Sequence, residues 1–162
     1  MRNITKILFV CTGNTARSPA AEYLAKYYAK KAGLDIKFES AGFINAFSYM
    51  QPESRKFLDK MKIDHSDFSP QLVSGDLIKK HDLIITMERS HKTRIINTYS
   101  QLGEIQKKTY TLKEFTGASG SLDIEDPYYT SSSRYREILN AIDENIKKLM
   151  QIFKEENQNI TF

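Results

Sequence analysis

The chain has 162 residues, of which 40% are hydrophobic, which is enough apolar material for one compact domain and too little for two. It contains no run of about 18 apolar residues that could cross a bilayer, and the apolar stretch near its start is too short for a signal peptide. One cysteine cannot form an internal disulfide, and a net charge of +4 spread over lysine pairs is typical of a solvated surface. We therefore expect a cytoplasmic protein with a single domain over residues 1–162.

Strands and helices alternate along the chain. The first strand, KILFV at residues 6–10, is a continuous apolar run, as expected of a strand covered on both faces, and residues 19–32 predict a helix that ends at Gly33. Further strands are expected at residues 36–40, 82–87 and 108–112, with helices at 52–61, within 72–81 and at 88–99. Apolar residues at helical spacing predict a long C-terminal helix: Ile138, Ile142, Ile146, Leu149 and Phe153.

This alternation predicts an α/β fold, a three-layer sandwich in which an open, parallel, four-stranded sheet carries helices on both faces. In such sheets the functional crevice lies at the carboxyl ends of the strands, where the strand order reverses. The loop after the first strand, CTGNTARS at residues 11–18, ends at that crevice. Its backbone amides can turn inward and the next helix adds a partial positive charge, so the loop can bind an anion of the size of phosphate.

The polar residues of this loop each have a chemical use at such a site. We expect the surrounding amides and the helix terminus to favour the thiolate of Cys11, which would be nucleophilic near neutral pH. Arg17 can fold back and hold two oxygens of the anion with its planar guanidinium. Gly13 lets the backbone approach the ligand, and Asn14 tolerates a left-handed conformation. Ser18 is placed to cap the following helix, and its hydroxyl is near enough in sequence to assist the thiolate.

Simpler interpretations of this loop exist. A cysteine at the end of a strand is often a small buried apolar residue. Here, however, it precedes an Arg-Ser pair, with glycine and asparagine in between, at a strand-to-helix junction, and this combination favours a functional site. A Walker nucleotide-binding loop is excluded because no Gly-Lys-Ser/Thr follows, and the Rossmann glycine pattern is absent.

Four motifs stand out: FVCTGNTARSPAAE near the start, SAG at residues 40–42, LIITM before the expected helix at 88–99, and DPYY at residues 126–129. Together they resemble the low-molecular-weight protein tyrosine phosphatase family, and the resemblance extends over most of the chain. The first and last motifs are highly specific in combination. The resemblance implies a flavodoxin-like fold with a four-stranded parallel sheet, in agreement with the alternation of elements.

The resemblance also implies a protein tyrosine phosphatase that works in two steps without a metal or another cofactor. Cys11 would attack phosphorus and form a cysteinyl-phosphate while Arg17 and the loop amides hold the other oxygens. Asp126 would protonate the leaving oxygen and then act as base on the water that hydrolyses the intermediate. Ser40 and Asn14 look like supports of the loop. The implied phosphate- and substrate-binding residues are Thr12, Gly13, Asn14, Thr15, Ala16, Ser18, Tyr128 and Tyr129.

Some positions depart from the family pattern. Ala16 stands where many members carry a second cysteine directly before the arginine. Thr15 replaces the larger aliphatic residue of tyrosine-specific members and resembles the protein arginine phosphatase branch, as does TLKEFTG at residues 111–117. The tyrosine pair at residues 128–129 resembles the tyrosine-specific members instead. We therefore expect phosphotyrosine as the substrate, with phosphoarginine as the alternative.

The sequence leaves one wall of the cleft unassigned and disfavours two other functions. The first wall of the cleft lies in FINAFSYMQP after SAG, where Phe43, Phe47 or Tyr49 can serve. A thioredoxin-coupled arsenate reductase would need further cysteines, and a non-catalytic phosphate-binding module would not need nucleophile, clamp and acid together. The three histidines show no metal-ligand spacing. We expect phosphorylated proteins as partners, neither nucleic acid nor a membrane, and a monomer.

Overall fold

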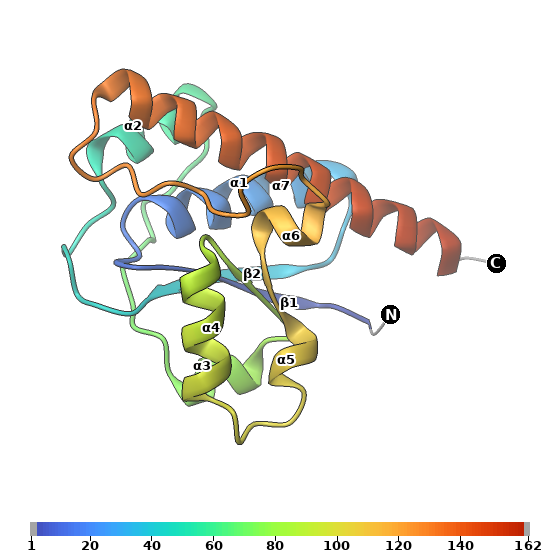
Figure 1. The fold of residues 1–162 in the computed structure, drawn as a ribbon. Helices are drawn as coiled ribbons and strands as arrows, with labels where there is room; N and C mark the ends of the chain where they lie inside the picture. The colour runs from blue at the N-terminus through green and yellow to red at the C-terminus, as the bar shows by residue number, and fades with distance from the viewer. Residues whose placement is uncertain (1–2, 161–162) are drawn as a thin grey trace.

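Four parallel strands form the central layer of the protein (Figure 1). The computed structural model describes residues 3–160. The strands are β1 at Lys6–Cys11, β2 at Lys37–Gly42, β3 at Leu83–Thr86 and β4 at Thr109–Thr111, in the order β2-β1-β3-β4. Because β2 pairs with one edge of β1 and β3 with the other, the strand order reverses at the carboxyl end of β1.

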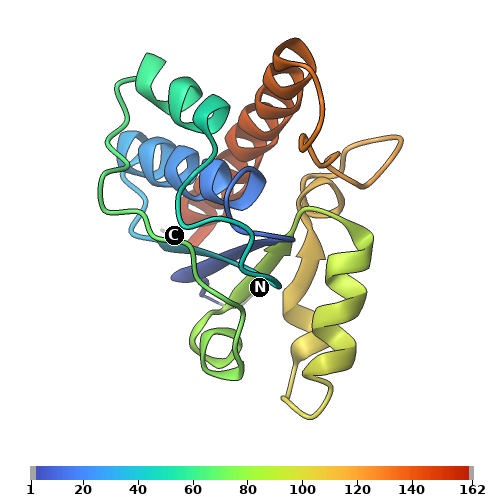
Figure 2. The same ribbon diagram turned by 90° about the vertical axis from the view of Figure 1, so that its left-hand side faces the viewer.

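Helices cover both faces of this sheet, as the end-on view in Figure 2 shows. One face carries α1 at Arg17–Ala32, α2 at Pro52–Lys60 and α7 at Ser132–Ile160, and α1 packs against both of the others. The opposite face carries α3 at Gly75–Lys80, α4 at Arg89–Thr98 and α5 at Ile105–Lys108. The short α6 at Leu112–Thr116 follows β4 and packs against α7.

The side chains of β1 alternate between two apolar cores. Ile7 and Phe9 point into the larger core, which they share with α1 and α7, whereas Leu8 and Val10 point into the smaller core with α3, α4 and α5. All four side chains are fully buried. Because both faces of this strand are covered, neither face needs polar side chains, and the sequence KILFV is therefore a continuous apolar run.

The predicted fold class is confirmed, and every strand and helix expected from the sequence is present within a few residues of its predicted bounds. The helices α5 and α6 were not predicted. The first is a single turn, IQKK, too short to show a periodic pattern. The second begins with a capping box between Thr111 and Glu114, a signal that the sequence TLKE does contain. Within residues 3–160, no helix combines the length and the apolar character needed to span a membrane.

Candidate active site

The loop of residues 12–16 joins β1 to α1 at the carboxyl edge of the sheet. Asn14 has φ of 54°, in the left-handed region expected for it. The structure adds a second reason for glycine at position 13, because a Cβ built on Gly13 would come within 2.8 Å of the Cβ of Ala46. Glycine therefore lets the segment after β2 approach the loop, a contact between distant segments that the loop sequence alone did not indicate.

Cys11 lies at the end of β1 with only 2% of its surface exposed, and its sulfur faces the first turn of α1. The Sγ atom is 2.9 Å from the Oγ of Ser18. The prediction that Ser18 caps the helix is wrong, since α1 already begins at Arg17, and the N-cap residue Ala16 makes no side-chain hydrogen bond. The Ser18 hydroxyl contacts the Cys11 sulfur instead. The first backbone N–H groups of α1 therefore receive no hydrogen bond from the side chain of the N-cap residue.

A chain of buried hydrogen bonds supports the loop from behind. The amide Nδ2 of Asn14 donates to the hydroxyls of Ser18 and Ser40, each at 2.9 Å, and the backbone N–H of Gln71 donates to Asn14 Oδ1 at 3.0 Å. Ser40 in turn donates to the carboxylate of Glu22. Burial raises the pKa of Glu22, while Lys26, 2.7 Å away, opposes this shift. These contacts fix the strained turn at Asn14.

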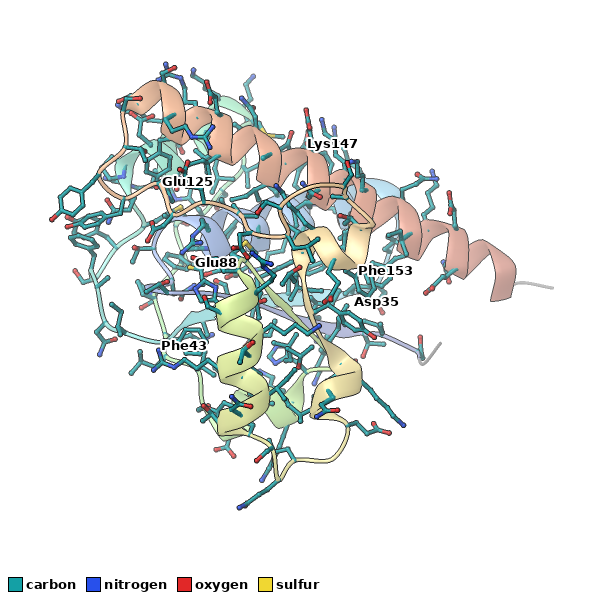
Figure 3. The ribbon with its side chains drawn as sticks, viewed as in Figure 1. Asp35, Phe43, Glu88, Glu125, Lys147 and Phe153 are labelled. Atoms are coloured by element: carbon teal, nitrogen blue, oxygen red, sulfur yellow. The ribbon has the colours of Figure 1, made fainter. Side chains whose placement is uncertain are left out.

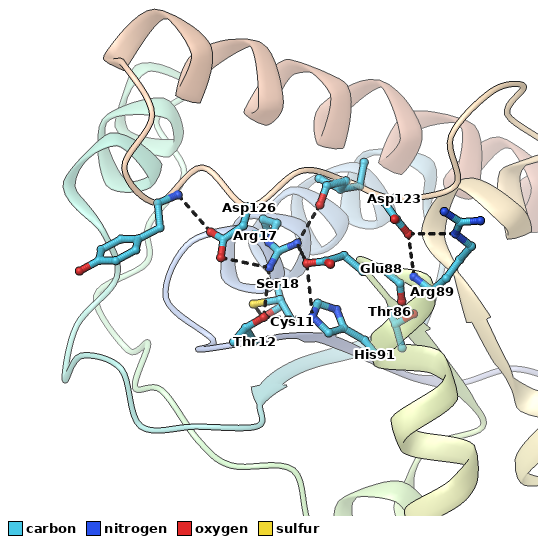
Figure 4. Close-up of polar contacts among 12 residues, drawn as sticks. Cys11, Thr12, Arg17, Ser18, Thr86, Glu88, Arg89, His91, Asp123 and Asp126 are labelled. Carbon is cyan, nitrogen blue, oxygen red and sulfur yellow. Dashed lines mark hydrogen bonds and ion pairs between the residues drawn. The ribbon is translucent and has the colours of Figure 1, made fainter.

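The Arg17 guanidinium is almost completely buried and held on several sides (Figure 4). Its Nη1 donates to Glu88 Oε2 at 2.6 Å and to the carbonyl of Ile124 at 2.7 Å. The Nη2 group donates to Thr12 Oγ1 at 3.3 Å and lies 3.8 Å from Asp126 Oδ2. Sequence reasoning missed Glu88, although a carboxylate directly after a parallel strand lies at the same edge as the loop.

His91, on the first turn of α4, completes this network. Its Nε2 lies 3.0 Å from Thr12 Oγ1 and 3.5 Å from Glu88 Oε2. Its Nδ1 is buried without a hydrogen-bond partner among the described residues. Burial and the nearby Arg17 guanidinium lower the pKa of His91 to about 4, against the opposing effect of Glu88. A neutral ring therefore faces Thr12 at neutral pH.

Asp126 lies on the long loop before α7, with about half of its side chain exposed, and shares a cavity with Cys11. Its Oδ1 accepts a hydrogen bond from the backbone N–H of Tyr128 at 3.0 Å. Tyr128 lines the same cavity, whereas Tyr129 is 93% exposed and packs on the Tyr128 ring with the centroids 4.1 Å apart. Of the two predicted tyrosines, only the first reaches the cavity.

The cavity has a volume of about 390 Å³, and most residues of the loop line it. Residues 43–49, which we call the aromatic wall, form one side, and of their aromatic side chains Phe47 lines the cavity. Tyr49 packs behind Phe47 at 5.8 Å, and Phe43 packs against His91 at 5.6 Å. The lining residues are Cys11, Thr12, Gly13, Thr15, Ala16, Arg17, Ile44, Ala46, Phe47, Gln51, Asp126, Tyr128 and Tyr135.

Most of the predicted site residues thus meet around one cavity, whereas Asn14, Ser18 and Tyr129 do not line it. Gln51 and Tyr135 were not predicted, because each reaches the cavity from a helical segment far from the loop in sequence. The Tyr135 hydroxyl is 2.8 Å from Ser54 Oγ, which donates to the carbonyl of Ala16. Burial raises the pKa of Tyr135 to about 12.

The model of the family described as low molecular weight phosphotyrosine protein phosphatase matches residues 6–159 of this chain. The chain belongs to this family. It is 34% identical over 154 residues to a protein-arginine-phosphatase of Bacillus subtilis, covering 94% of this chain and 99% of the relative. It is 35% identical to the low molecular weight protein-tyrosine-phosphatase PtpB of Staphylococcus haemolyticus, covering 85% of this chain and 91% of the relative.

Solved structures of similar sequence have the same fold as this chain. A mutant of YwlE from Bacillus subtilis is 32% identical and superposes with a TM-score of 0.81, covering 93% of this chain and 99% of the other. A low molecular weight protein tyrosine phosphatase from T. tengcongensis is 34% identical with a TM-score of 0.81, covering 91% of this chain and 98% of the other. The fold and the enzyme family are therefore established for this phosphatase, with relatives of both named specificities.

Proposed function

We propose that this protein hydrolyses phosphotyrosine in proteins through a cysteinyl-phosphate on Cys11. The observation that carries the proposal is the position of the sulfur, which shares one cavity with an acid, a guanidinium and three aromatic side chains. Phe47 and Tyr128 lie 6.0 Å apart between ring centroids, on the wall of the cavity. A phenyl ring can lie against them with its phosphate directed to the loop, because aromatic rings favour offset or edge contacts at such distances.

In the first step, Sγ of Cys11 attacks phosphorus, the new S–P bond forms, and the bond from phosphorus to the tyrosyl oxygen breaks. The Ser18 hydroxyl, 2.9 Å from the sulfur, would donate to the thiolate and hold it in place. The amides of residues 12–17 and the Arg17 guanidinium would bind the three remaining oxygens, whose charge persists through the transition state. Because Glu88 and Ile124 already hold Nη1, Arg17 needs little ordering when the anion arrives.

Asp126 would act in both steps. It would give its proton to the tyrosyl oxygen as that oxygen leaves, and then take a proton from the water that attacks the cysteinyl-phosphate and releases inorganic phosphate. Its half-exposed carboxylate lines the same cavity as Cys11, within reach of a leaving group and a water molecule bound there. Every step is assigned to side chains, backbone amides and water.

A thiol that must stay reduced fits a cytoplasmic location, and we propose that the protein works there as a monomer.

A second candidate substrate, phosphoarginine, is favoured by Thr15. Its side chain lines the cavity, where a hydroxyl can accept from the guanidinium of a leaving arginine. The named activity of the Bacillus subtilis relative supports the same alternative. For a guanidinium leaving group, an isoleucine at this place would leave buried N–H groups without a partner, at a cost of about 1–3 kcal/mol.

The test is a parallel measurement of kcat/KM on a phosphotyrosyl and a phosphoarginyl peptide of the same sequence, for the wild type and for Thr15→Ile. The proposal expects the wild type to prefer phosphotyrosine and Thr15→Ile to keep or raise that activity while losing about one to two decades on phosphoarginine. The variant Cys11→Ser should hydrolyse neither peptide. A wild type that prefers phosphoarginine would replace the first candidate with the second, and turnover by Cys11→Ser would contradict both.

A further inference from the structure

Two arginines beside the cavity, Arg94 and Arg55, rest on aromatic rings of the aromatic wall. The Cζ atom of Arg94 lies 4.3 Å from the ring centroid of Phe43, and that of Arg55 lies 5.9 Å from the centroid of Tyr49. Both arginines are exposed. In the part of the chain that the structure describes, neither guanidinium has a carboxylate within ion-pair distance. Each is therefore a positive group held against a ring, with its N–H edge open to solvent.

Four other cations near the carboxyl edge of the sheet are paired with carboxylates. Arg17 is paired with Glu88, and Lys92 with Glu114. Arg89 lies 3.5 Å from Asp123 and Arg134 lies 2.6 Å from Glu125. These four cations are matched within the protein, whereas Arg94 and Arg55 lie on rings of the aromatic wall and have no carboxylate partner among the described residues. Their charges are available to a partner.

The aromatic wall joins these arginines to the mouth of the cavity. The backbone N–H groups of Phe43 and Ile44 both donate to the carbonyl of Thr12, at 2.7 and 3.1 Å, so the start of the wall is fixed to the loop. Ile44 and Phe47 line the cavity between its ends. Figure 3 shows Phe43 alongside α4, the helix that carries Arg94 one turn after His91. Arg94 therefore lies near the start of the wall and Arg55, through Tyr49, near its end.

A protein substrate must lie across the mouth of the cavity and therefore close to the aromatic wall. When a phosphorylated side chain enters the cavity, the residues before and after it lie over the mouth, spaced by about 3.3 Å each along an extended chain. Side chains one to three positions away from the phosphorylated residue then come within reach of the wall. Acidic side chains are the ones that an unpaired guanidinium binds best, through two parallel N–H···O hydrogen bonds.

We propose that Arg94 and Arg55 form the two ends of a docking surface, built on the aromatic wall, for acidic residues that flank the phosphorylated residue of the substrate. Stacking on Phe43 and Tyr49 orients each guanidinium in advance, which reduces the side-chain ordering that binding would otherwise require. The inference rests on the proposed phosphatase activity. It would let the enzyme discriminate among protein substrates. The cavity alone cannot do so, because it holds only the phosphorylated side chain.

The test compares two phosphotyrosyl peptides of equal length, one with aspartate and glutamate around the phosphotyrosine and one with alanine and glutamine at those positions. We expect the wild type to show a higher kcat/KM on the acidic peptide, and Arg94→Ala and Arg55→Ala each to reduce that preference about two- to fivefold, as for exposed ion pairs. Hydrolysis of p-nitrophenyl phosphate and of the neutral peptide should stay unchanged. Added salt should reduce the wild-type preference, because the groups are exposed.

The matched control is Lys79→Ala, which removes one exposed positive charge from the end of α3, before β3 and therefore at the opposite edge of the sheet. It should leave the preference intact. An acidic preference that survives in the Arg55→Ala/Arg94→Ala double variant would overturn the docking surface, as would an equal loss on p-nitrophenyl phosphate.

If the wild type hydrolyses no substrate, the proposed function fails but the docking surface is still tested. Fluorescence anisotropy would then measure the affinity of Cys11→Ser for the two labelled peptides. A tighter Kd for the acidic peptide that the arginine substitutions remove would support the surface, and equal Kd values would overturn it.

Discussion

Glu88 is the carboxylate on which the position of Arg17 depends most. The pair is short and its arginine is almost completely buried, so loss of the carboxylate leaves a guanidinium in a low-dielectric site with only the carbonyl of Ile124 and the hydroxyl of Thr12 as close acceptors. A guanidinium in that state would turn toward water or toward Asp126. Either movement would take it away from the position in which it can bind the anion.

We predict that Glu88→Gln lowers kcat/KM on p-nitrophenyl phosphate by about tenfold to a hundredfold, because the anion loses a preorganised guanidinium. The affinity for vanadate, measured as inhibition, should fall with it. Glu125→Gln is the matched control: it breaks a pair with Arg134 of the same 2.6 Å length in which both side chains are half exposed. That variant should keep nearly full activity, and equal losses in the two variants would contradict a special role for Glu88.

Asp126 is proposed as the group that protonates the leaving oxygen. Asp126→Ala should therefore slow aryl phosphates with poor leaving groups much more than those with good ones, since a good leaving group needs little protonation. The measurement is a plot of log kcat/KM against the pKa of the leaving phenol, which should be steeper for the variant. Equal slowing across the series would mean that the carboxylate is structural, or that Asp123 or Glu125 supplies the proton.

The residues found from the sequence and those missed differ in how they reach the site. Cys11, Arg17 and their neighbours lie in one contiguous loop, whose chemistry can be understood from the order of its residues. Glu88 comes from the segment after β3 and Tyr135 from α7, so their contacts with the site depend on packing between segments that are distant in sequence. The error at Ser18 has the same origin, because its hydroxyl had two possible partners and the fold placed the sulfur closer.

At the scale of elements, the loop after β1 and the end of β2 pack backbone against backbone. A Cβ built on Gly42 would lie 2.7 Å from the N of Asn14, 2.8 Å from the carbonyl carbon of Gly13 and 2.9 Å from the O of Thr12. None of these atoms belongs to a flexible side chain. Glycine at position 42, part of the SAG motif, is therefore required by the close approach of β2 to the anion-binding loop.

Gly42→Ala should displace the loop amides and reduce kcat/KM on p-nitrophenyl phosphate by at least about tenfold, with a loss of stability of about 1–3 kcal/mol from overpacking. Thermal unfolding separates the two effects, because the activity should be lost well below the melting temperature of the variant. Gly103→Ala serves as control, since a Cβ at that position meets no atom within 4 Å. Wild-type activity in Gly42→Ala would show that the loop tolerates the shift.

Periodicity predicted the elements that bury a whole face and missed the two shortest helices, α5 and α6. The C-terminal helix was visible because Ile138, Ile142 and Ile146 recur along one side, and the same face packs against α1. The helix α6 is five residues long, and its start was marked only by the capping box at Thr111. Which helix covers which face follows from the strand order, and that order depends on pairings between distant segments.

For the molecule as a whole, the folded state keeps His91 neutral and should lose stability in acid. The pKa of its ring is lowered to about 4 in the folded protein, from an ordinary value of 6.5. Between these pH values the unfolded chain binds a proton that the folded chain does not, so the free energy of unfolding falls as the pH falls from about 6.5 toward 4. The loss between pH 7 and pH 5 should be on the order of 1–2 kcal/mol.

Urea unfolding at pH 7 and pH 5 measures this contribution. His91→Gln retains an amide that can reach Thr12 but does not titrate, so its stability should fall less between the two pH values than that of the wild type. His65→Gln is the control, because His65 pairs with Asp59 at the surface and lies away from the cavity. If His91→Gln and the wild type lose the same stability, the ring does not carry the effect.

The central position of β1 has a consequence for how the activity would be lost. This strand is bonded on both edges, to β2 and β3, and buried on both faces, so its amide hydrogens can exchange with solvent only when the sheet itself comes apart. Cys11 is the last residue of that strand. Fraying of surface loops leaves the nucleophile where it is, and a protease that cuts only transiently opened segments would not reach it. The position of the nucleophile would then be lost only on global unfolding.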